Sequence, residues 1–232
     1  MIFMTQVIPN VYQFRFRYAN VFLIVEDKLT LIDTGVRRNS RWIIKGIHSL
    51  GRSPEEIKFI VLTHNHFDHT GGLPVFRKLT KAKVFAPKID FTLDKDTVPY
   101  PVYVNAFLSM PGFSLLKKRW ILTDKDVDTL LIGGEILPVL GGLQVITTPG
   151  HTSGSISLYA PQKKLLFVAD AIKKRRGLHL PLKTATTDIN QAIASIEKMT
   201  QLDVETICFG HGRPITKDAK RRLERLLEKI RN

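Results

Sequence analysis

The chain has 232 residues, of which 44% are hydrophobic and 24% charged, and these fractions are ordinary for a globular protein with one large domain or two small ones. Its single cysteine, Cys208, excludes an intrachain disulfide, and its longest apolar stretch, 130–146, is interrupted by a charge, a proline and four glycines, which excludes a membrane span there. The net charge of +14 is compatible with a nucleic-acid surface, an anionic substrate or a solvated basic face.

The distribution of the charge bears on nucleic-acid binding, and the start of the chain bears on the compartment. Basic residues are spread over the whole chain, so nucleic-acid binding is the less favoured explanation of the charge. The first ten residues lack a basic region followed by an apolar core, so no signal peptide is expected. Because the lone cysteine also allows a reducing compartment, we expect a cytoplasmic protein.

Apolar periodicity predicts strands and helices in the first part of the chain. Three strands are expected between residues 11 and 33, and an amphipathic helix is expected over 40–50. The sequence Ser-Pro-Glu-Glu at 53–56 is typical of a helix start with a capping box. The remaining elements expected here are a strand over 59–62, a short helix over 73–79 and a strand over 83–86.

The segment 88–128 has a different composition, because prolines and aromatic residues crowd it and at most two regular elements fit. We expect an irregular insertion within a single domain spanning 1–232. Such an insertion beside a functional site is often a lid or a substrate wall, and the alternative is a connecting subdomain whose aromatic residues pack inward. The residues expected to wall an apolar substrate pocket are Tyr100, Tyr103, Phe107 and Phe113.

The second half of the chain predicts another run of strands followed by helices. Two such runs suggest two β-sheets packed face to face with helices outside, although the pattern alone establishes only a mixture of α and β structure. The expected strands are 130–143, 144–147, 155–159, 165–169 and 206–209, and the expected helices are 188–199 and 217–230.

A cluster of metal-ligand side chains follows the expected strand 59–62. Its three histidines and one carboxylate lie within six consecutive positions, and two glycines then allow a sharp turn into the next helix. A strand-to-helix loop is where α/β proteins usually place chemistry. Neutral imidazole suits zinc, iron and nickel, so the cluster predicts a metal site. Its members are His64, His66, Asp68 and His69.

Three later turns each add one candidate ligand after an apolar strand. His151 lies between Pro149-Gly150 and Thr152, Asp170 directly follows the run 165–169, and His211 lies between two glycines. A carboxylate at the end of a buried strand is costly unless a cation neutralises it, so Asp170 in particular indicates a metal. We expect four strand ends to converge on one rim of the sheets.

These motifs carry a family resemblance. The pattern HxHxDH at 64–69 resembles the signature of the metallo-β-lactamase superfamily, and Pro149-Gly150-His151-Thr152, Ala169-Asp170 and Gly210-His211-Gly212 resemble its remaining motifs in the same order. The resemblance covers nearly the whole chain. It implies an α+β fold, an αββα sandwich of two mixed β-sheets with helices on the outer faces.

The resemblance also implies a role for each ligand. A first divalent ion would be held by His64, His66 and His151, a second by Asp68, His69 and His211, and Asp170 would bridge them. The expected metal is zinc, with iron or manganese as alternatives, and a hydroxide shared by the two ions would be the nucleophile.

Two acidic residues have further implied roles. Asp68 is the candidate catalytic residue, because it could orient the nucleophile or protonate the leaving group. In the superfamily an Asp-Thr-Gly such as Asp33-Thr34-Gly35 packs beneath the metal site, and the alternative here is a simple turn.

The expected function is hydrolysis of a small ester, thioester or lactone. Glyoxalase-II-type thioesterases resemble the first motif but carry a second histidine where this chain has Ser155, and acyl-homoserine-lactone hydrolases share the ligand set. An alternative of the same fold is an iron-dependent persulfide dioxygenase, which would use one iron. A third possibility, suggested by charge alone, is a nucleic-acid-binding or phosphodiester-cleaving protein.

The basic run 173–176 begins three residues after Asp170, and three residues span at most about 10 Å. Part of this run therefore lies near the metal rim. We expect Arg175 and Arg176, with His179 on the same loop, to bind a carboxylate or phosphate of an anionic substrate. The alternative is a solvated charge run without a ligand.

Overall fold

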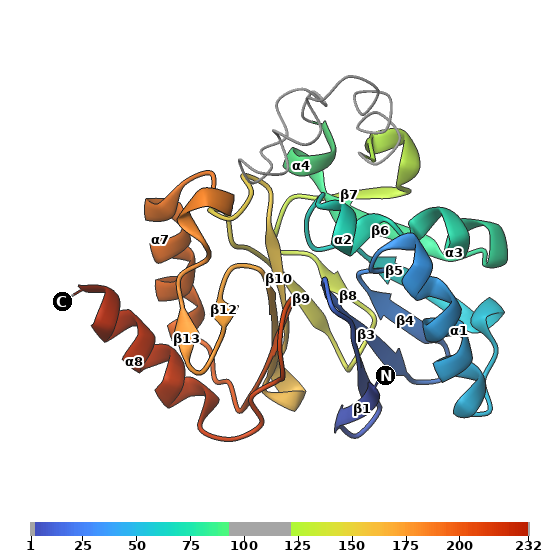
Figure 1. Ribbon diagram of the computed structural model, residues 1–232, viewed down its shortest axis with the longest axis horizontal. Helices are drawn as coiled ribbons and strands as arrows, with labels where there is room; N and C mark the ends of the chain where they lie inside the picture. Colours follow the sequence, from blue (N-terminus) through green and yellow to red (C-terminus); the bar gives the residue numbers. More distant parts are fainter. Residues whose placement is uncertain (1–2, 93–121, 232) are drawn as a thin grey trace.

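Two β-sheets packed face to face form the centre of the molecule, and helices cover both outer faces (Figure 1). The computed structural model describes residues 3–92 and 122–231. The expected α+β sandwich of two mixed sheets is confirmed. No helix in the described part of the chain is long and apolar enough to cross a membrane.

The first sheet contains seven strands that follow one another in sequence order. The first four pair antiparallel, whereas the later pairs are parallel and so require crossover connections. The strands are β1 (Phe3–Ile8), β2 (Val11–Arg15), β3 (Asn20–Val25), β4 (Leu29–Ile32), β5 (Ile57–Val61), β6 (Lys83–Pro87) and β7 (Thr129–Leu131).

The second sheet contains five strands in the spatial order β14, β11, β10, β9, β8. The β11–β14 pair is parallel and the others are antiparallel, and a separate hairpin, β12–β13, follows β11. The strands are β8 (Ile136–Leu137), β9 (Leu143–Thr147), β10 (Ile156–Ala160), β11 (Leu165–Ala169), β12 (Lys173–Lys174), β13 (Leu178–His179) and β14 (Thr206–Phe209).

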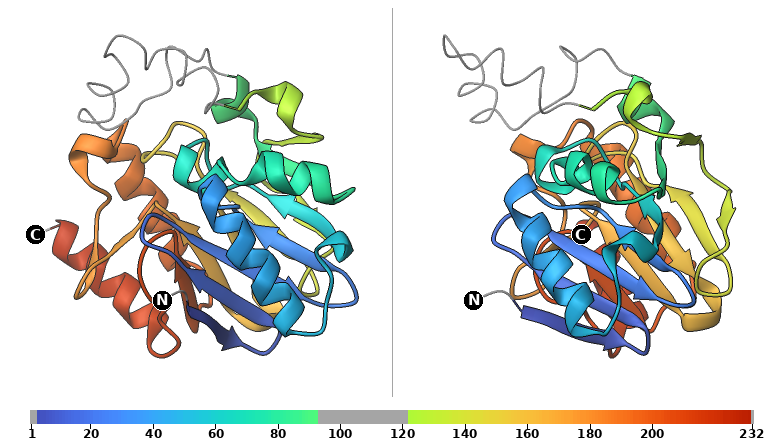
Figure 2. Two further views of the ribbon diagram at one scale, coloured as in Figure 1. Left: turned by 45° about the vertical axis from the view of Figure 1, so that its right-hand side comes forward. Right: turned by 90° about the vertical axis from the view of Figure 1, so that its right-hand side faces the viewer.

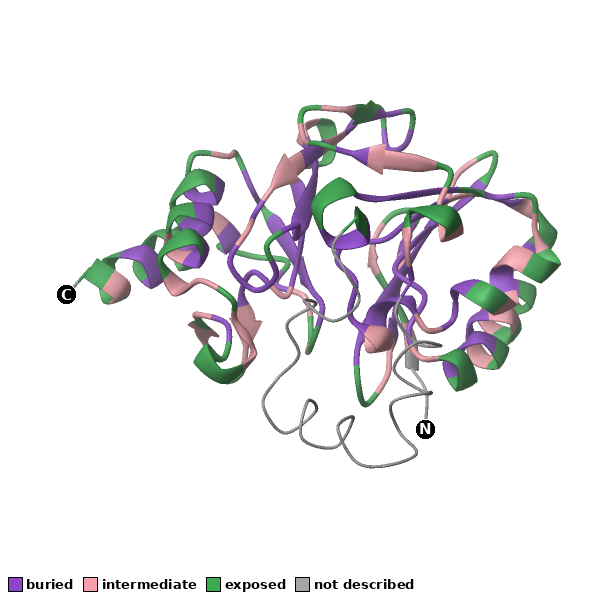
Figure 3. Cartoon of the chain, turned by 90° about the horizontal axis from the view of Figure 1, so that it is seen from above, coloured by how far each residue is buried: buried purple, intermediate pink, exposed green. Residues whose placement is uncertain are grey.

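Helices lie against the outer faces of the sheets (Figure 2), and the long ones are buried on one side and exposed on the other (Figure 3). The carboxylate of Asp188 caps one of them by accepting from the N–H groups of Asn190 and Gln191. The helices are α1 (Ser40–Ser49), α2 (Phe67–Thr70), α3 (Leu73–Leu79), α4 (Lys88–Thr92), α7 (Ile189–Thr200) and α8 (Ala219–Arg231). Short 3-10 turns are η1 (Arg37–Asn39), η2 (Pro54–Glu56), η3 (Asp124–Asp126), η4 (Pro161–Lys163) and η5 (Lys183–Ala185).

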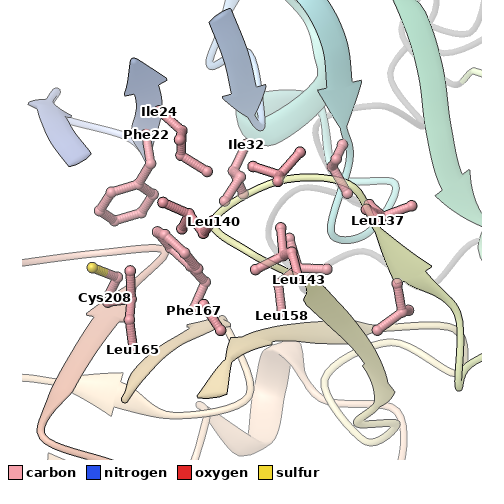
Figure 4. Packing of buried hydrophobic residues seen from close by; sticks show 14 of the residues in the cluster. Phe22, Ile24, Ile32, Leu137, Leu140, Leu143, Leu158, Leu165, Phe167 and Cys208 are labelled. Atoms are coloured by element: carbon pink, nitrogen blue, oxygen red, sulfur yellow. The ribbon is translucent and has the colours of Figure 1, made fainter. Parts of the chain in front are cut away.

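The main core lies between the two sheets (Figure 4). At its centre Phe22 of β3 packs edge-on against Phe167 of β11, with ring centres 5.2 Å apart. Two further apolar clusters lie under the helices, one beneath α1 and α3 and the other beneath α7 and α8. Because the inner strands are covered on both faces, they are apolar along their whole length, as β11 illustrates.

One expected strand is wrong. The apolar stretch 130–143 forms two short strands in different sheets, β7 in the first and β8 in the second. Gly133 and Gly134 lie between them with φ of 98° and 92°, a backbone conformation that interrupts a strand. The segment is therefore where the chain passes from one sheet to the other. At 53–56 the expected capping box of Ser53 and Glu56 is present, but it starts only a single 3-10 turn.

The packing between the sheets generates the first prediction. Replacing Phe167 by Ala should lower the free energy of unfolding by about 3–5 kcal/mol, because it removes a fully buried ring and leaves a cavity. Urea denaturation followed by circular dichroism measures this change. The matched control is Ile132→Ala, whose side chain is 71% exposed and should change stability by about 0.5 kcal/mol or less. Similar losses in the two variants would show that the sheet interface is not the main core.

Candidate metal centre

Four loops meet at one rim of the sandwich, and each leaves the carboxyl end of a strand. The loop after β5 continues into α2, and the others follow β9, β11 and β14. Chains that leave the ends of neighbouring strands are brought together without long excursions. The candidate ligands on these four loops are His64, His66, Asp68 and His69, then His151, then Asp170, and then His211.

Three buried imidazoles form the first group of candidate ligands. Nε2 of His64 lies 3.2 Å from Nδ1 of His66, and Nε2 of His151 lies 3.0 Å from the same Nδ1. One nitrogen from each ring lies within 4.8 Å of the other two. Imidazole nitrogens that converge in this way have the donor type and spacing of a zinc or iron site.

A second group lies beside the first and reaches the surface. It comprises Asp68, His69 and the exposed His211, and their ligand atoms also lie within 4.8 Å of one another. Nε2 of His211 is 3.8 Å from Oδ2 of Asp68, and Nε2 of His69 is 4.0 Å from the same oxygen. The two groups therefore differ in exposure, with all-histidine ligands inside and a mixed set at the rim.

Asp170 lies between the two groups. Its Oδ2 is 3.5 Å from Nε2 of His151 and 3.0 Å from Nε2 of His211, and its Oδ1 is 3.5 Å from Nε2 of His69. It also completes a third possible ligand set with His64 and His69. Its carboxylate thus contacts members of both groups, which is the position that a bridging ligand requires.

Unpartnered polar atoms indicate that these residues fit a cation. Nε2 of His69 and Oδ1 of Asp170 are buried, face each other, and have no hydrogen-bond partner in the described part of the chain. A buried polar atom without a partner is costly, and a metal ion would satisfy both atoms at once. The donor set of imidazole and carboxylate suits divalent zinc, iron or manganese.

Asp33 orients two of the histidines from beneath. Its Oδ2 accepts from Nδ1 of His69 at 2.7 Å, which leaves Nε2 of that ring for a metal. Thr63 donates its hydroxyl to Asp33 at 2.9 Å and lies 3.0 Å from Nδ1 of His64, which likewise leaves Nε2 of His64 available. Carboxylates that hold metal-binding histidines in this way fix the tautomer and the ring orientation.

The backbone around Asp33 holds the same loop. The carbonyl of His69 accepts from the N–H groups of Thr34 at 2.7 Å and Gly35 at 3.1 Å, and from the Thr34 hydroxyl at 3.0 Å. The segment Asp33-Thr34-Gly35 therefore packs beneath the ligands and is more than a simple turn. Asp33 itself has a φ of 60°, which aspartate tolerates better than most residues.

The charges of the site determine the protonation of its ligands. Burial lowers the pKa of His64 well below its ordinary value and lowers that of His151 to about 4, so both rings are neutral at pH 7 and able to bind a metal. Burial also disfavours charge on His69, but the carboxylates of Asp170 and Asp33 raise its pKa to about 10. Although burial opposes it, His211 and His69 hold the pKa of Asp170 well below its usual range. The centre therefore presents an ionised carboxylate to an incoming cation.

Comparison with known proteins shows the family of the chain. A family model described as the metallo-beta-lactamase superfamily matches residues 14–211. The chain belongs to the metallo-beta-lactamase superfamily. Over 218 residues it is 27% identical to the probable metallo-hydrolase YflN of Bacillus subtilis, a match that covers 85% of this chain and 82% of that protein.

Two further similar proteins extend the comparison. A hydroxyacylglutathione hydrolase of Bartonella tribocorum is 28% identical over 173 residues, which cover 72% of this chain and 54% of that protein. The crystal structure of the metallo-beta-lactamase family protein TTHA1429 from Thermus thermophilus has the same fold, with a TM-score of 0.74 and 24% identity. That alignment covers 97% of this chain and 81% of the other.

Asp90 was not predicted as a site residue from the sequence, but it joins two of the loops that carry candidate ligands. Its Oδ2 accepts from the N–H of Asn65 at 3.1 Å and from the Thr152 hydroxyl at 2.7 Å, and its Oδ1 accepts from the N–H of Gly154 at 2.7 Å. Asp90 therefore ties the loop of His64 and His66 to the loop of His151. It lies in the segment expected to be irregular, and no motif there marks it.

Asn20 performs a similar task for the loop of His211. Its side-chain amide donates to the carbonyls of Phe209 and Gly212, both at 2.8 Å, and its N–H donates to the carbonyl of Gly210 at 2.7 Å. Gln13 adds a fourth bond, also to Gly212, at 2.8 Å. Side chains of the first sheet thus hold a ligand loop of the second. An asparagine and a glutamine within expected strands are the only sequence signal for this role.

Gly210 is required by the position of Asp170. A Cβ atom at residue 210 would lie 1.9 Å from Oδ1 of Asp170 and 2.9 Å from Cε1 of His69. The carboxylate therefore occupies the space that any larger residue would need. The glycine before His211 is thus part of the ligand arrangement as well as of the turn.

The residues predicted to contact the substrate lie in two different segments of the chain. Tyr100, Tyr103, Phe107 and Phe113 lie outside the described residues. Arg175 and Arg176 are exposed at the turn of the β12–β13 hairpin, where Nε2 of His179 donates to the carbonyl of Arg175 at 3.0 Å. Within the same basic run, Lys174 lies beside the loop of His211, because its backbone and side chain pack against Gly212.

The contacts of Asp33 generate the second prediction. Asp33→Asn should weaken metal binding about 10–100-fold while preserving the fold, because asparagine accepts the backbone conformation but cannot hold His69 and Thr63 as the carboxylate does. Competition with a chromophoric chelator measures the affinity. Asp218→Asn is the matched control, since Asp218 has a φ of 56° and is exposed away from the centre. Unchanged affinity in the first variant would remove the orienting role of Asp33.

The close approach at Gly210 generates the third prediction. Gly210→Ala should displace the carboxylate of Asp170 and reduce the metal bound per chain, as measured by elemental analysis after dialysis. In Gly177→Ala, the nearest neighbour of the new Cβ would be 3.5 Å away, so this control should retain its metal. Full metal content in the Gly210 variant would contradict the described packing of Asp170.

Proposed function

We propose that this metal-dependent hydrolase acts on a small ester, thioester or lactone and that it binds two divalent ions. The observation that supports this most is the position of Asp170, whose carboxylate contacts both the buried histidine group and the group at the rim. If the centre held only one ion, one of the two groups of candidate ligands would bind no metal. The same reasoning disfavours the persulfide dioxygenase alternative, which would use one iron.

Each candidate ligand receives a role in this proposal. His64, His66 and His151 hold the first ion, Asp68, His69 and His211 hold the second, and Asp170 binds both. Zinc is the proposed metal because imidazole predominates, and iron and manganese are compatible with the same donors. When bound, such ions lower the pKa of water to about 7 and polarise a carbonyl oxygen, so they supply both a nucleophile and an electrophilic catalyst.

Asp68 is the proposed catalytic residue of the chain itself. It is less buried than the histidines beside it, with a side chain 19% exposed, and its Oδ2 faces His211 across 3.8 Å at the open side of the centre. A carboxylate at this position can hold the proton that the nucleophile gives up and pass it to the departing alkoxide or thiolate. Asp68 would thereby carry a proton at the side of the centre that is open to solvent.

The substrate class is proposed from chemistry and from similarity. A hydroxyacylglutathione hydrolase is among the similar proteins, so an acyl substrate is in keeping with the superfamily. Ser155, where the glyoxalase-II pattern has a second histidine, hydrogen-bonds within its own loop, with Oγ 2.6 Å from the Thr152 hydroxyl. The position that differs is thus structural in this chain, and we do not assign glutathione as the substrate.

The expected substrate residues remain part of the proposal. Tyr100, Tyr103, Phe107 and Phe113 are proposed to wall the acyl part of the substrate, and Arg175, Arg176 and His179 are proposed to contact an anionic group. Lys174, which packs against Gly212, brings the same basic run to the loop of His211. Nucleic acid is not proposed as a substrate.

A substrate panel tests the proposed reaction. The protein is freed of metal, reloaded in parallel with zinc, manganese or iron, and assayed with aryl esters, acyl thioesters, acyl lactones and phosphodiesters. Hydrolysis of one acyl class in a metal-dependent manner is the expected result. Hydrolysis confined to the phosphodiester, or consumption of oxygen with a persulfide by the iron form, would contradict it.

The bridging role of Asp170 generates the fourth prediction. Asp170→Ala should lower metal content at both sites, because the lost carboxylate contacts both ligand groups, whereas His211→Ala should leave about one ion per chain. Elemental analysis of the two variants, purified in the same way without chelators, measures the difference. Wild-type metal content in both would rule out the bridging assignment.

A further inference from the structure

A surface hollow rich in arginine lies between the β2–β3 turn and the first turn of α1. Its volume is about 320 Å³, and none of the described residues that line it is acidic. Its lining includes four arginines and the two aromatic residues that contact guanidinium groups, and we call it the basic hollow. These residues are Arg15, Arg17, Tyr18, Arg38, Arg41 and Trp42.

Two segments connect the basic hollow to the metal centre. Arg15 pairs in register with Asn20, which holds the loop of His211 through Phe209, Gly210 and Gly212. On its other side, Arg38 follows Val36 by two residues, and the Cα of Val36 would lie 3.4 Å from a Cβ added at Gly71. Gly71 itself follows His69 by two residues. The hollow therefore adjoins two of the ligand loops.

The cations of the basic hollow surround its aromatic rings. The guanidinium of Arg38 lies 5.3 Å from the ring centre of Tyr18, and that of Arg17 lies 6.0 Å from the same ring. The guanidinium of Arg41 lies 5.1 Å from the ring centre of Trp42. These contacts hold the guanidinium groups in place at the surface, since a cation is attracted to the face of an aromatic ring.

Three arginines of the basic hollow have no ion pair with a carboxylate of the described residues. Among the described residues, none of the acidic side chains forms an ion pair with Arg17, Arg38 or Arg41. By contrast, the basic residues of α8 are interspersed with Glu224 and Glu228 along the same helix. Like charges gathered without counterions repel one another, and a bound anion relieves that repulsion.

We propose that the basic hollow binds the phosphate end of a small organic phosphate whose acyl bond lies at the metal centre. The fork of a guanidinium matches two phosphate oxygens, and several arginines at one place favour phosphate over a neutral group. Tyr18, with a side chain 40% exposed, offers a planar group of the ligand an accessible aromatic surface. The inference rests on the proposed function for the reaction, and it gives the net charge of +14 a specific purpose.

Direct binding separates this proposal from the proposed reaction. Phenyl phosphate is titrated into the metal-loaded protein and, separately, into the chelator-treated protein, because a phosphate could also bind the metals. The double variant Arg38→Gln/Arg41→Gln should bind phenyl phosphate at least about tenfold more weakly than the wild type, with and without metal. The reason is that each substitution removes a charged hydrogen-bond donor. Benzyl alcohol is the neutral analogue, and its binding should not differ between the variant and the wild type.

Matched controls keep the effect local. Arg225→Gln removes an exposed arginine of α8 and should leave the affinity for phenyl phosphate within about twofold of wild type. Arg175→Gln tests the basic run of the β12–β13 hairpin, which the proposed function also assigns to an anionic group, and that group need not be the phosphate. Equal binding by the wild type and the Arg38/Arg41 variant, or a loss only in the Arg175 variant, would overturn the proposal.

A polymeric ligand is the remaining alternative. A single-stranded oligonucleotide that binds more tightly as its length increases, loses affinity steeply with salt, and depends on Arg38 and Arg41 would assign the basic hollow to nucleic acid and overturn the proposal. If the acyl substrate panel is negative but phenyl phosphate binding depends on these arginines, the site stands and the proposed reaction fails. If a substrate that carries both an acyl bond and a separate phosphate group is hydrolysed, its KM should rise in the Arg38/Arg41 variant, whereas kcat at saturation should not change.

Discussion

The contact between Asp170 and His69 is the constraint on which the rest of the structure depends. Asp170 directly follows β11 of the second sheet, and His69 lies on α2 after β5 of the first. Their ligand atoms are 3.5 Å apart. Such an approach is possible only where the two sheets meet at a common rim, and it fixes Gly210 because no Cβ fits beside the carboxylate. Because the buried Oδ1 of Asp170 faces Nε2 of His69 and neither atom has a hydrogen-bond partner among the described residues, a bound cation would stabilise this contact.

Buried polar residues hold the ligand loops around this contact. Asp33 supports the loop after β5, Asp90 joins that loop to the one carrying His151, and Asn20 fixes the loop carrying His211. Each is buried, and each uses several hydrogen bonds, which is the condition under which a buried polar network gives a rigid and specific arrangement. Buried hydrogen bonds therefore hold the centre beneath the ligands, whereas Asp68 and His211 reach its open side.

The fold was predictable where burial alone determines the local structure. Continuous apolar runs became β3, β4 and β11 because both faces of these strands are covered. The stretch 130–143 was not predictable in the same way. Its apolar residues serve two sheets, and the division at Gly133 and Gly134 follows from where the chain crosses between them. Periodicity within one segment does not carry that information.

The sequence by itself determined which side chains meet at the rim, because histidine and aspartate placed in glycine-flanked turns after apolar strands have few other purposes. It did not determine what holds them. Asp90 acts on Asn65, 25 residues away, and Asn20 acts on Gly212, 192 residues away. Likewise, the arginines of the basic hollow come from two separate segments, around residues 15–18 and 38–42. Only the tertiary structure decided these partnerships, since hydrogen bonds and charge clusters between distant segments exist only after the two sheets have packed together.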